Sequence, residues 1–405
     1  MGLGNCDFDS IIDRRGTNSL KHDCAELRGV PEGLLPLWVA DMDFRTADPV
    51  IAALKKTAEH GIFGYTVPGA AYYGAVRSWW GGRFGYDFDA RSVVVTPGVV
   101  FSLAQAVRAF TEPGDAVLIQ RPVYYPFTEV IECNRRRVVN SPLVLGDDGR
   151  YHVDFADFEK QLAQERPKLF ILCSPHNPVG RVWSRVELER MGDLCLAHGC
   201  MVVSDEIHAD FTYGGNRHTV FSTIKGEFRD NSVVCTAPSK TFNLAGLQVS
   251  NIVVENSALR RRYRKEIEVS GYSQPNVMGV AACQAAYEDG GPWLEELTEY
   301  IQGNIRLTEK YFPSVTAQGD PGRGAHGVRS IPLEGTYLQW LDFRGTGLSH
   351  SDADSLLINR AGVWLDSGTM FGAEGEGFQR VNIASPRRLL REAYEKIASE
   401  TEFSN

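Results

Sequence analysis

The chain has 405 residues, of which 43% are hydrophobic and 23% are charged, and its formal net charge at pH 7 is -9. These values are typical of a folded globular protein and exclude a disordered or fibrous chain. The acidic balance argues against a nucleic-acid-binding face, because phosphate backbones are bound chiefly by lysine and arginine. No apolar run reaches the roughly 18 residues of a membrane span, and residues 1–15 contain no apolar stretch of the signal-peptide type. We therefore expect a cytoplasmic protein that binds neither nucleic acid nor membrane.

The cysteines do not predict a metal site. All eight are scattered along the chain, and none falls in a C-x-x-C pair. Cys195, His198 and Cys200 lack the spacing and the further partners of a zinc site. We expect reduced, mostly buried thiols and no bound metal.

Short β-rich runs alternate with longer helical patterns from about residue 46 to 284. This alternation is typical of crossover units on a mostly parallel sheet. The clearest helix begins with the capping box Ser184 and Glu187 and ends at Gly199. The six predicted strands are 93–95, 116–119, 169–173, 201–203, 233–235 and 252–254.

The pattern changes beyond about residue 285. A helix precedes a predicted strand at 336–341, which is followed by a helix at 351–359 and a C-terminal helix from about Arg388. The sequence thus predicts an α/β fold with a large domain (46–284), built on a mostly parallel central sheet, and a smaller α+β C-terminal domain (285–405). Residues 1–45 form an N-terminal segment that we expect to pack with the small domain.

Polar side chains follow several of the predicted strands. Asn177 comes after the third strand, Asp205 after the fourth and Lys240 after the fifth. In an open parallel sheet, ligands bind outside the carboxyl ends of the strands, so these side chains are expected at one site. After the first strand, Gly98 leads directly into an apolar helix. The free N–H groups and the dipole at such a helix start favour an anion.

A lysine, an aspartate, an asparagine and an anion site at four strand ends are what a pyridoxal cofactor requires. Lys240 would hold pyridoxal 5'-phosphate as a Schiff base, Asp205 would pair with the protonated ring nitrogen, and Asn177 would donate to the phenolic oxygen. Tyr124, after the second strand, would stack on the ring, a contact worth about 1 kcal/mol. Taken singly, each residue has an ordinary structural role, as a surface lysine, a cap, a turn residue or a core aromatic. Their joint placement favours the cofactor.

These segments resemble the class I/II aminotransferase superfamily of fold-type I pyridoxal-phosphate enzymes, and most closely its MalY/PatB subfamily of cystathionine β-lyases, or C–S lyases. The superfamily segments are Gly98-Val99-Val100, Tyr124, Ser174 to Gly180, Asp205 to His208, and Ser239 to Asn243. The subfamily segments are Trp38 to Phe44, Phe63 to Thr66, Gly335 to Leu338, and Gly377 to Asn382. The resemblance runs from about Phe8 to the final helix.

The resemblance implies further roles. Arg380 would bind the substrate α-carboxylate, for which a guanidinium fork is the natural partner. Tyr65 would reach across a dimer interface to the cofactor phosphate of the other subunit, which implies a homodimer with shared active sites. His208 lies near the ring, or is a buried packing residue. The implied phosphate-binding residues are Gly98, Val99, Val100, Ser239 and Tyr65, and the implied substrate-binding residues are Val39, Ala40, Tyr125, Asn177 and Arg380.

Two positions depart from the pattern of many aminotransferases. Gln248 stands where an arginine often grips the phosphate, and Ala237 stands where a serine is common. Both changes place more of the phosphate binding on the helix start, on Ser239 and on the partner's Tyr65. Both are also more consistent with the lyase subfamily than with the transaminases.

The implied reaction is the α,β-elimination of a cysteine S-conjugate or cystathionine, an amino-acid substrate, to thiol, pyruvate and ammonia. Its expected catalytic residues are Lys240, Tyr124 and Asp205, with the freed Lys240 amine as the base that removes the α-proton. Transamination and a decarboxylating reaction, including one on a cysteine conjugate in a specialised pathway, remain alternatives, because the sequence does not fix which bond stands perpendicular to the ring. A catalytically idle binding or regulatory protein is disfavoured by the intact lysine, aspartate, asparagine and arginine.

Overall fold

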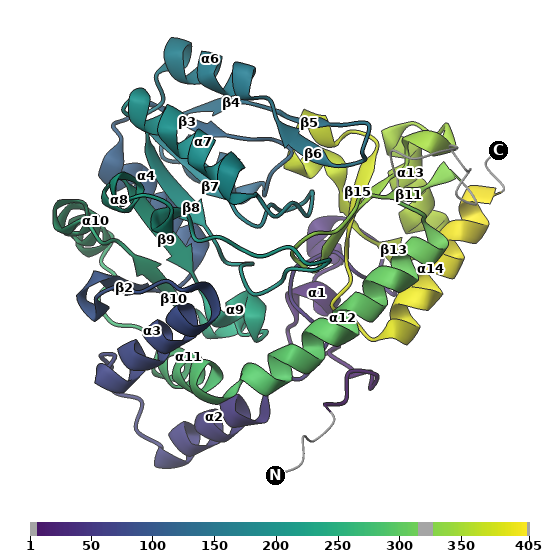
Figure 1. Ribbon diagram of the computed structural model, residues 1–405. Helices are drawn as coiled ribbons and strands as arrows, with labels where there is room; N and C mark the ends of the chain where they lie inside the picture. Colours follow the sequence, from purple (N-terminus) through teal and green to yellow (C-terminus); the bar gives the residue numbers. More distant parts are fainter. Residues whose placement is uncertain (1–5, 315–326, 403–405) are drawn as a thin grey trace.

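The computed structural model describes residues 6–314 and 327–402. Its largest element is a seven-stranded sheet that Figure 1 shows between layers of helices. The strand order is β2-β10-β9-β8-β7-β3-β4, and only β10 runs antiparallel to its neighbours. The bounds are β2 (Val93–Thr96), β10 (Ser250–Val253), β9 (Ser232–Thr236), β8 (Met201–Asp205), β7 (Leu169–Cys173), β3 (Ala116–Ile119) and β4 (Arg137–Asn140). The prediction of a mostly parallel central sheet is confirmed.

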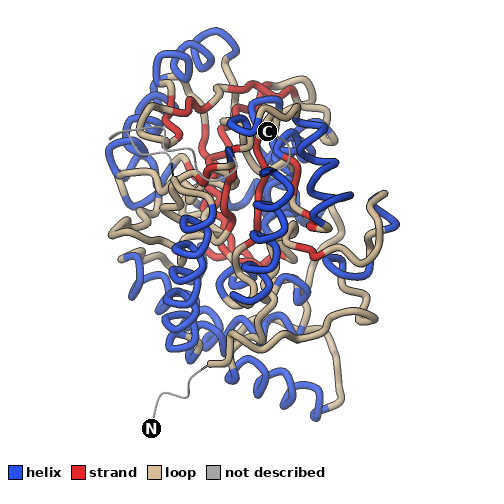
Figure 2. The backbone as a smooth tube through the Cα atoms, turned by 90° about the vertical axis from the view of Figure 1, so that its right-hand side faces the viewer, coloured by secondary structure: helices blue, strands red, loops and turns tan. Residues whose placement is uncertain are grey.

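The central strands β7, β8 and β9 are buried along their whole length because both faces of the sheet are covered. Along β7, Leu169 and Ile171 pack on one side with α4 (Val99–Phe110), α5 (Pro126–Glu132) and α10 (Ser257–Val269). Phe170 and Leu172 pack on the other side with α6 (Phe155–Glu165), α7 (Arg185–Ala197) and α8 (Gly226–Asp230). In the view of Figure 2, the strands form an inner layer with helices around it. In an open sheet covered on both faces, ligands bind outside the carboxyl ends of the strands.

The predicted helix after Ser184 is α7. The Ser184 hydroxyl accepts the Glu187 N–H at 3.2 Å, and the Glu187 carboxylate accepts the Ser184 N–H at 2.8 Å. The helix ends at Ala197, just before Gly199 at φ +64°. The capping box is therefore confirmed.

Further helices precede β2 or follow β9. The helix α11 (Val277–Asp289) runs through residue 284, where the boundary of the large domain is predicted, so the predicted domain bounds stay a prediction. These helices are α1 (Leu20–Asp23), α2 (Asp48–His60), α3 (Ala70–Phe84), α9 (Pro238–Thr241) and α11 (Val277–Asp289). The hairpin β5 (Leu143–Leu145) and β6 (Tyr151–Val153) completes this part.

A second, antiparallel sheet has the order β11-β12-β15-β14. Its strands are β11 (Arg329–Ser330), β12 (Leu338–Asp342), β15 (Phe378–Asn382) and β14 (Asp366–Ser367). The long helix α12 (Gly291–Tyr311) runs from α11 toward this sheet and lies beside α14 (Arg387–Glu402), as Figure 1 shows. The N-terminal segment reaches this half of the molecule through β1 (Leu35–Pro36), which pairs with β13 (Val363–Trp364).

Two predicted elements of this half differ from the structure. The strand predicted at 336–341 begins at Leu338, because Thr336 has φ +70° and leaves the extended conformation. The helix predicted at 351–359 is α-helical only in α13 (His350–Ser355) and continues as the π-helical η7 (Leu356–Ala361), which stops at Gly362 with φ +64°. In the part of the chain that the structure describes, no helix is long and apolar enough to cross a membrane.

Candidate active site

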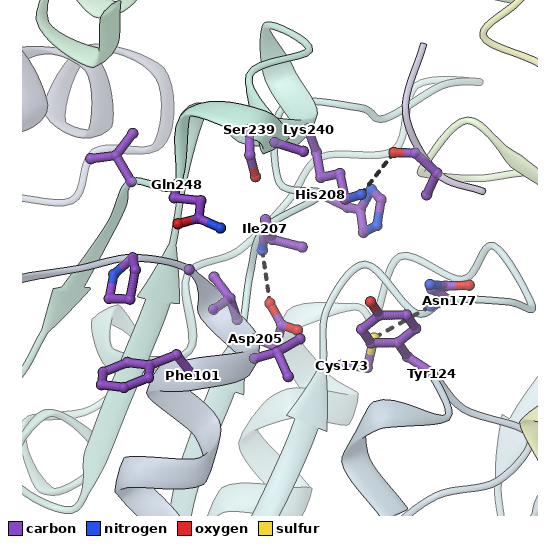
Figure 3. Close-up of a pocket in the computed structure, with 17 residues that line it drawn as sticks. Phe101, Tyr124, Cys173, Asn177, Asp205, Ile207, His208, Ser239, Lys240 and Gln248 are labelled. Atoms are coloured by element: carbon purple, nitrogen blue, oxygen red, sulfur yellow. Dashed lines mark hydrogen bonds between the residues drawn. The ribbon is translucent and has the colours of Figure 1, made fainter. Parts of the chain in front are cut away.

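A cavity of about 400 Å³ opens at the carboxyl ends of β7, β8 and β9. Figure 3 shows that its wall is built from the segments that follow these strands, together with the start of α4. Ten of the residues predicted from the sequence line it, namely Ala40, Gly98, Val99, Val100, Tyr124, Asn177, Asp205, His208, Ser239 and Lys240. The structure therefore brings these ten residues together around one cavity.

Lys240 is held inside the cavity by the N-terminal segment. It lies on the short helix α9, and its Nζ donates to the Ala40 carbonyl at 2.7 Å. The Tyr337 hydroxyl donates to the same carbonyl at 3.0 Å. The pKa of Lys240 is lowered to about 8, because the protein desolvates the ammonium; Arg380 lowers it further, while Asp41 and Asp205 oppose the shift. Near neutral pH this amine is thus far closer to losing its proton than an exposed lysine.

Asp205 is the last residue of β8 and is 4% exposed. Its carboxylate accepts the Ile207 N–H at 3.2 Å, and Figure 3 shows the side chain facing the cavity. Burial raises the pKa of Asp205 to about 7; the neighbouring Glu206 adds to the shift and Lys240 opposes it. A carboxylate in this position gains stability from any cation that is placed beside it.

The start of α4 forms a further part of the wall. Gly98 precedes the helix, and its carbonyl accepts the first helical hydrogen bond, from Ser102 N–H at 3.1 Å. The N–H groups of the first turn therefore have no partner within the helix. A Cβ added at Gly98 would meet no atom within 4 Å, and Gly98, Val99 and Val100 all line the cavity, so the helix start borders open space. Ser239 and Gln248 add polar side chains to the same wall.

Two further polar side chains border the cavity. Asn177 is 3% exposed, and its backbone carbonyl accepts the Tyr124 N–H at 3.1 Å, which ties two strand ends together. His208 packs edge-on against Tyr337, with ring centroids 5.7 Å apart. Burial, and then the charges of Lys240 and Arg380, lower the pKa of His208, so its imidazole is neutral. Its Nδ1 is buried without a hydrogen-bond partner among the described residues.

Arg380 lies on β15 behind the cavity wall and is 2% exposed. Its guanidinium donates to Asn177 Oδ1 at 3.0 Å and to the Trp38 carbonyl at 3.0 Å, and it forms an ion pair with Asp366. The guanidinium carbon lies 4.8 Å from the centroid of the Phe371 ring. Arg380 Nε is buried without a partner in the described part of the chain. The arginine is thus fixed in place while one donor stays available.

Besides Arg380, three other predicted site residues do not line this cavity. Tyr65 is 97% exposed and borders a separate surface hollow, which shares Pro97 and Gln248 with the cavity. Val39 contributes its carbonyl, which accepts from Asn382 Nδ2 at 2.7 Å. Tyr125 lies beside Tyr124, with ring centroids 5.4 Å apart.

Sequence reasoning missed several residues of the site. Phe101, Cys173 and Ile207 line the cavity but carry no distinctive pattern. Asp366, the buried partner of Arg380, begins the two-residue strand β14, which is too short to give a pattern in the sequence.

The chain is similar to a protein family, to two known relatives and to a solved structure. The profile of the family "Aminotransferase class I and II" matches residues 33–397. The chain is 43% identical to cystathionine beta-lyase PatB of Bacillus subtilis, over 96% of this chain and 98% of PatB, and 35% identical to protein MalY of Escherichia coli, over 95% and 96%. Its fold is similar to that of cystalysin from Treponema denticola, whose crystal structure contains a pyridoxal 5'-phosphate cofactor. That similarity has a TM-score of 0.92 and 36% identity, over 99% of this chain and 100% of the other.

These matches extend over nearly the whole chain, and they agree with the fold described above. The predicted fold class and the predicted resemblance are both confirmed. The chain belongs to the class I and II aminotransferase family and, within it, to the group that includes PatB and MalY.

Proposed function

We propose that the protein is a pyridoxal-phosphate-dependent C–S β-lyase that cleaves cysteine S-conjugates to thiol, pyruvate and ammonia. The observation that carries this proposal is the position of Lys240, a lysine of lowered pKa, in a cavity bordered by a buried carboxylate and an open helix start. The 43% identity to PatB supports the choice of reaction.

The side chains of the cavity have the chemistry that this cofactor requires. Asp205 is a buried carboxylate that favours a cationic partner, such as a protonated ring nitrogen. The amides at the start of α4 and the hydroxyl of Ser239 are suited to a phosphate. Asn177 and His208 Nδ1 are polar groups available to a ring substituent. Lys240 supplies the amine to which the cofactor aldehyde attaches.

Pyridoxal phosphate, when bound, supplies an electron sink that stabilises negative charge on the α-carbon of an amino acid. Asp205 would hold the proton on the ring nitrogen and so maintain that sink. Lys240 Nζ would take the α-proton, and its lowered pKa suits it to act as a base near neutral pH. The Ala40 carbonyl holds this nitrogen at 2.7 Å and so limits where the base can move. Tyr124 would cover the ring.

Arg380 would bind the α-carboxylate of the substrate. Its contacts with Asn177, Trp38 and Asp366 fix the guanidinium before substrate arrives, which lowers the entropy lost on binding. Because the site is buried, a charge-assisted hydrogen bond to a carboxylate is worth more here than on the surface. Loss of a thiolate from the β-carbon would then complete the elimination, and the released aminoacrylate would react with water to give pyruvate and ammonia.

We further propose that the chain forms a homodimer in which Tyr65 of each subunit serves the cofactor phosphate of the other. Tyr65 lies in an exposed apolar stretch with Ile62, Phe63 and Val67, which are 61–78% exposed. Large apolar side chains gathered on a surface are typical of a protein interface. The hollow beside Tyr65 also shares two residues with the wall of the cavity. The enzyme is expected in the cytoplasm.

The experiment that tests the reaction is a product assay on the protein loaded with pyridoxal phosphate. With L-cystathionine or an S-alkyl cysteine, we expect thiol and pyruvate in equal amounts. Formation of the pyridoxamine form of the cofactor together with the keto acid of the intact substrate would show transamination instead, and release of carbon dioxide would show decarboxylation. Either result would overturn the proposed reaction while leaving the cofactor assignment intact.

A further inference from the structure

Arg28 is an arginine without an anionic partner near the substrate side of the site. It ends the short helix η1 (Glu26–Arg28) and is exposed. Its guanidinium carbon lies 4.3 Å from the centroid of the Trp38 ring. Over residues 6–314 and 327–402, the structure gives this guanidinium neither a hydrogen bond nor an ion pair. A guanidinium that rests on an aromatic face keeps its N–H donors free for an anion.

Trp38 connects Arg28 to the residue that would bind the α-carboxylate. The Trp38 ring is 2% exposed and is stacked on Trp364, with centroids 4.5 Å apart and an interplanar angle of 17°. Its indole N–H donates to the Lys21 carbonyl at 3.3 Å, so the ring is fixed. The backbone carbonyl of Trp38 accepts from Arg380 at 3.0 Å. One residue thus supports Arg28 on its ring and Arg380 on its backbone.

The charge of Arg28 acts on residues next to the cavity. Burial raises the pKa of Tyr125; Asp366 adds to the shift, whereas Arg380 and Arg28 oppose it. Burial likewise raises the pKa of Asp366, and both arginines oppose that shift. Tyr125 lies beside Tyr124, which lines the cavity. Because the charge of Arg28 acts on Tyr125, it also reaches the space just outside the cavity.

The charges on this side are unevenly balanced. Arg380 is paired with the carboxylate of Asp366. The exposed Glu129 also acts on Tyr125, but it forms no ion pair with Arg28. Arg28 is therefore a cation that an incoming anion can approach without displacing a protein carboxylate. A substrate whose α-carboxylate binds Arg380 would point its β-carbon and sulfur toward the cofactor. Its S-substituent would then extend out of the cavity, past the residues of the wall.

We propose that Arg28, held on the face of Trp38, binds a carboxylate at the far end of the S-substituent, so that the enzyme prefers cysteine conjugates that end in an anionic group. This inference rests on the proposed C–S lyase function. L-cystathionine belongs to this class, because it carries a second carboxylate beyond its sulfur. S-alkyl cysteines lack one.

The turnover test compares S-carboxyethyl-L-cysteine with S-propyl-L-cysteine, which differ at the end of the substituent. The preference is the ratio of their kcat/KM values. In Arg28→Gln we expect this ratio to fall by about two- to fivefold, the upper part of the range for an ion pair near a protein surface. Arg28→Lys should retain part of the preference, and added salt should reduce it in the parent enzyme. Arg190→Gln is the matched control, because Arg190 rests on Phe155 at 4.1 Å, on the distant helix α7.

A binding test makes the inference independent of turnover. α-Aminopimelate and α-aminoheptanoate replace the sulfur by a methylene, so neither can lose a thiolate, and calorimetry on the loaded enzyme gives their affinities. Tighter binding of α-aminopimelate in the parent, with that advantage lost in Arg28→Gln, supports the inference even if the protein proves to be a transaminase. Equal losses for both ligands would show that Arg28 only supports the fold, and an unchanged ratio would show that it does not meet the ligand. Either outcome overturns the inference.

Discussion

The two sides of the candidate site are built differently. The cofactor side, which comprises Lys240, Asp205 and the start of α4, comes from the carboxyl ends of three strands of one sheet. The substrate side, which comprises Arg380, Asp366, Trp38 and Arg28, comes from the N-terminal segment and the second sheet. The topology of a parallel sheet alone brings the first set together, whereas the second depends on the packing of segments far apart in the chain. We infer that the first side determines the chemistry and the second the choice of substrate.

The largest expected effect is on the cofactor side. Lys240→Ala should remove both the attachment of the cofactor and the base, and should lower kcat/KM by at least about a thousandfold. The visible absorption of the loaded protein should disappear as well. The control is Lys396→Ala, since Lys396 is an exposed lysine paired with Glu392 at 2.8 Å. Retained absorption in Lys240→Ala would place the attachment elsewhere.

On the substrate side, Arg380→Gln should lower kcat/KM by about a hundredfold, through loss of the buried charge that meets the α-carboxylate. It should also lower the free energy of unfolding by about 3–5 kcal/mol, because Asp366 is left buried without its partner. In the double variant Arg380→Gln, Asp366→Asn, stability should largely recover while kcat/KM stays low. Denaturant unfolding and steady-state kinetics measure the two quantities. Recovery of kcat/KM in the double variant would contradict the role assigned to Arg380.

Asp205 gives a prediction that depends on pH. In the cofactor-free protein its pKa is raised from 3.8 to about 7 by burial, so the folded state binds more protons than the unfolded state between these values. Its contribution to stability therefore falls as pH rises from about 4 to 7, by an amount on the order of a few kcal/mol. Asp205→Asn should melt higher than the parent at pH 8, without cofactor, and about equally at pH 4.

Adding the cofactor should reverse the order at pH 8, because the parent carboxylate then gains a cationic partner. Thermal melts at both pH values, with and without pyridoxal phosphate, test this. If cofactor-free Asp205→Asn had a lower melting temperature than the cofactor-free parent at pH 8, the buried carboxylate would not destabilise the parent at that pH.

The smallest expected effect concerns Tyr65, which within a single chain belongs neither to the cofactor side nor to the substrate side of the site. Tyr65→Phe removes only a hydroxyl, and we expect the affinity for pyridoxal phosphate to weaken by about three- to tenfold. The molecular mass in solution should remain that of a dimer. Fluorescence titration with the cofactor and light scattering provide the measurements, and an unchanged affinity would refute the role of this hydroxyl.

The cofactor side was predictable from the sequence because its signals are local. Lys240, Asp205 and Asn177 each follow an apolar run, and the capping box at Ser184 marks a helix directly. The substrate side was less predictable. The ion pair between Asp366 and Arg380 joins neighbouring antiparallel strands, and no periodic pattern in the sequence predicts that pairing. The strand β1 is only two residues long, which is too short to show a pattern. The left-handed Thr336 likewise broke a run that otherwise favours a strand.

The central claim is that Lys240 carries the cofactor of a C–S lyase, and reduction of the loaded protein with borohydride, followed by peptide mass spectrometry, tests it most directly. The account predicts a phosphopyridoxyl group on the peptide that contains Lys240, in a preparation that released pyruvate and thiol from a cysteine conjugate before reduction. A label on another lysine, or no label on a protein saturated with pyridoxal phosphate, would contradict it.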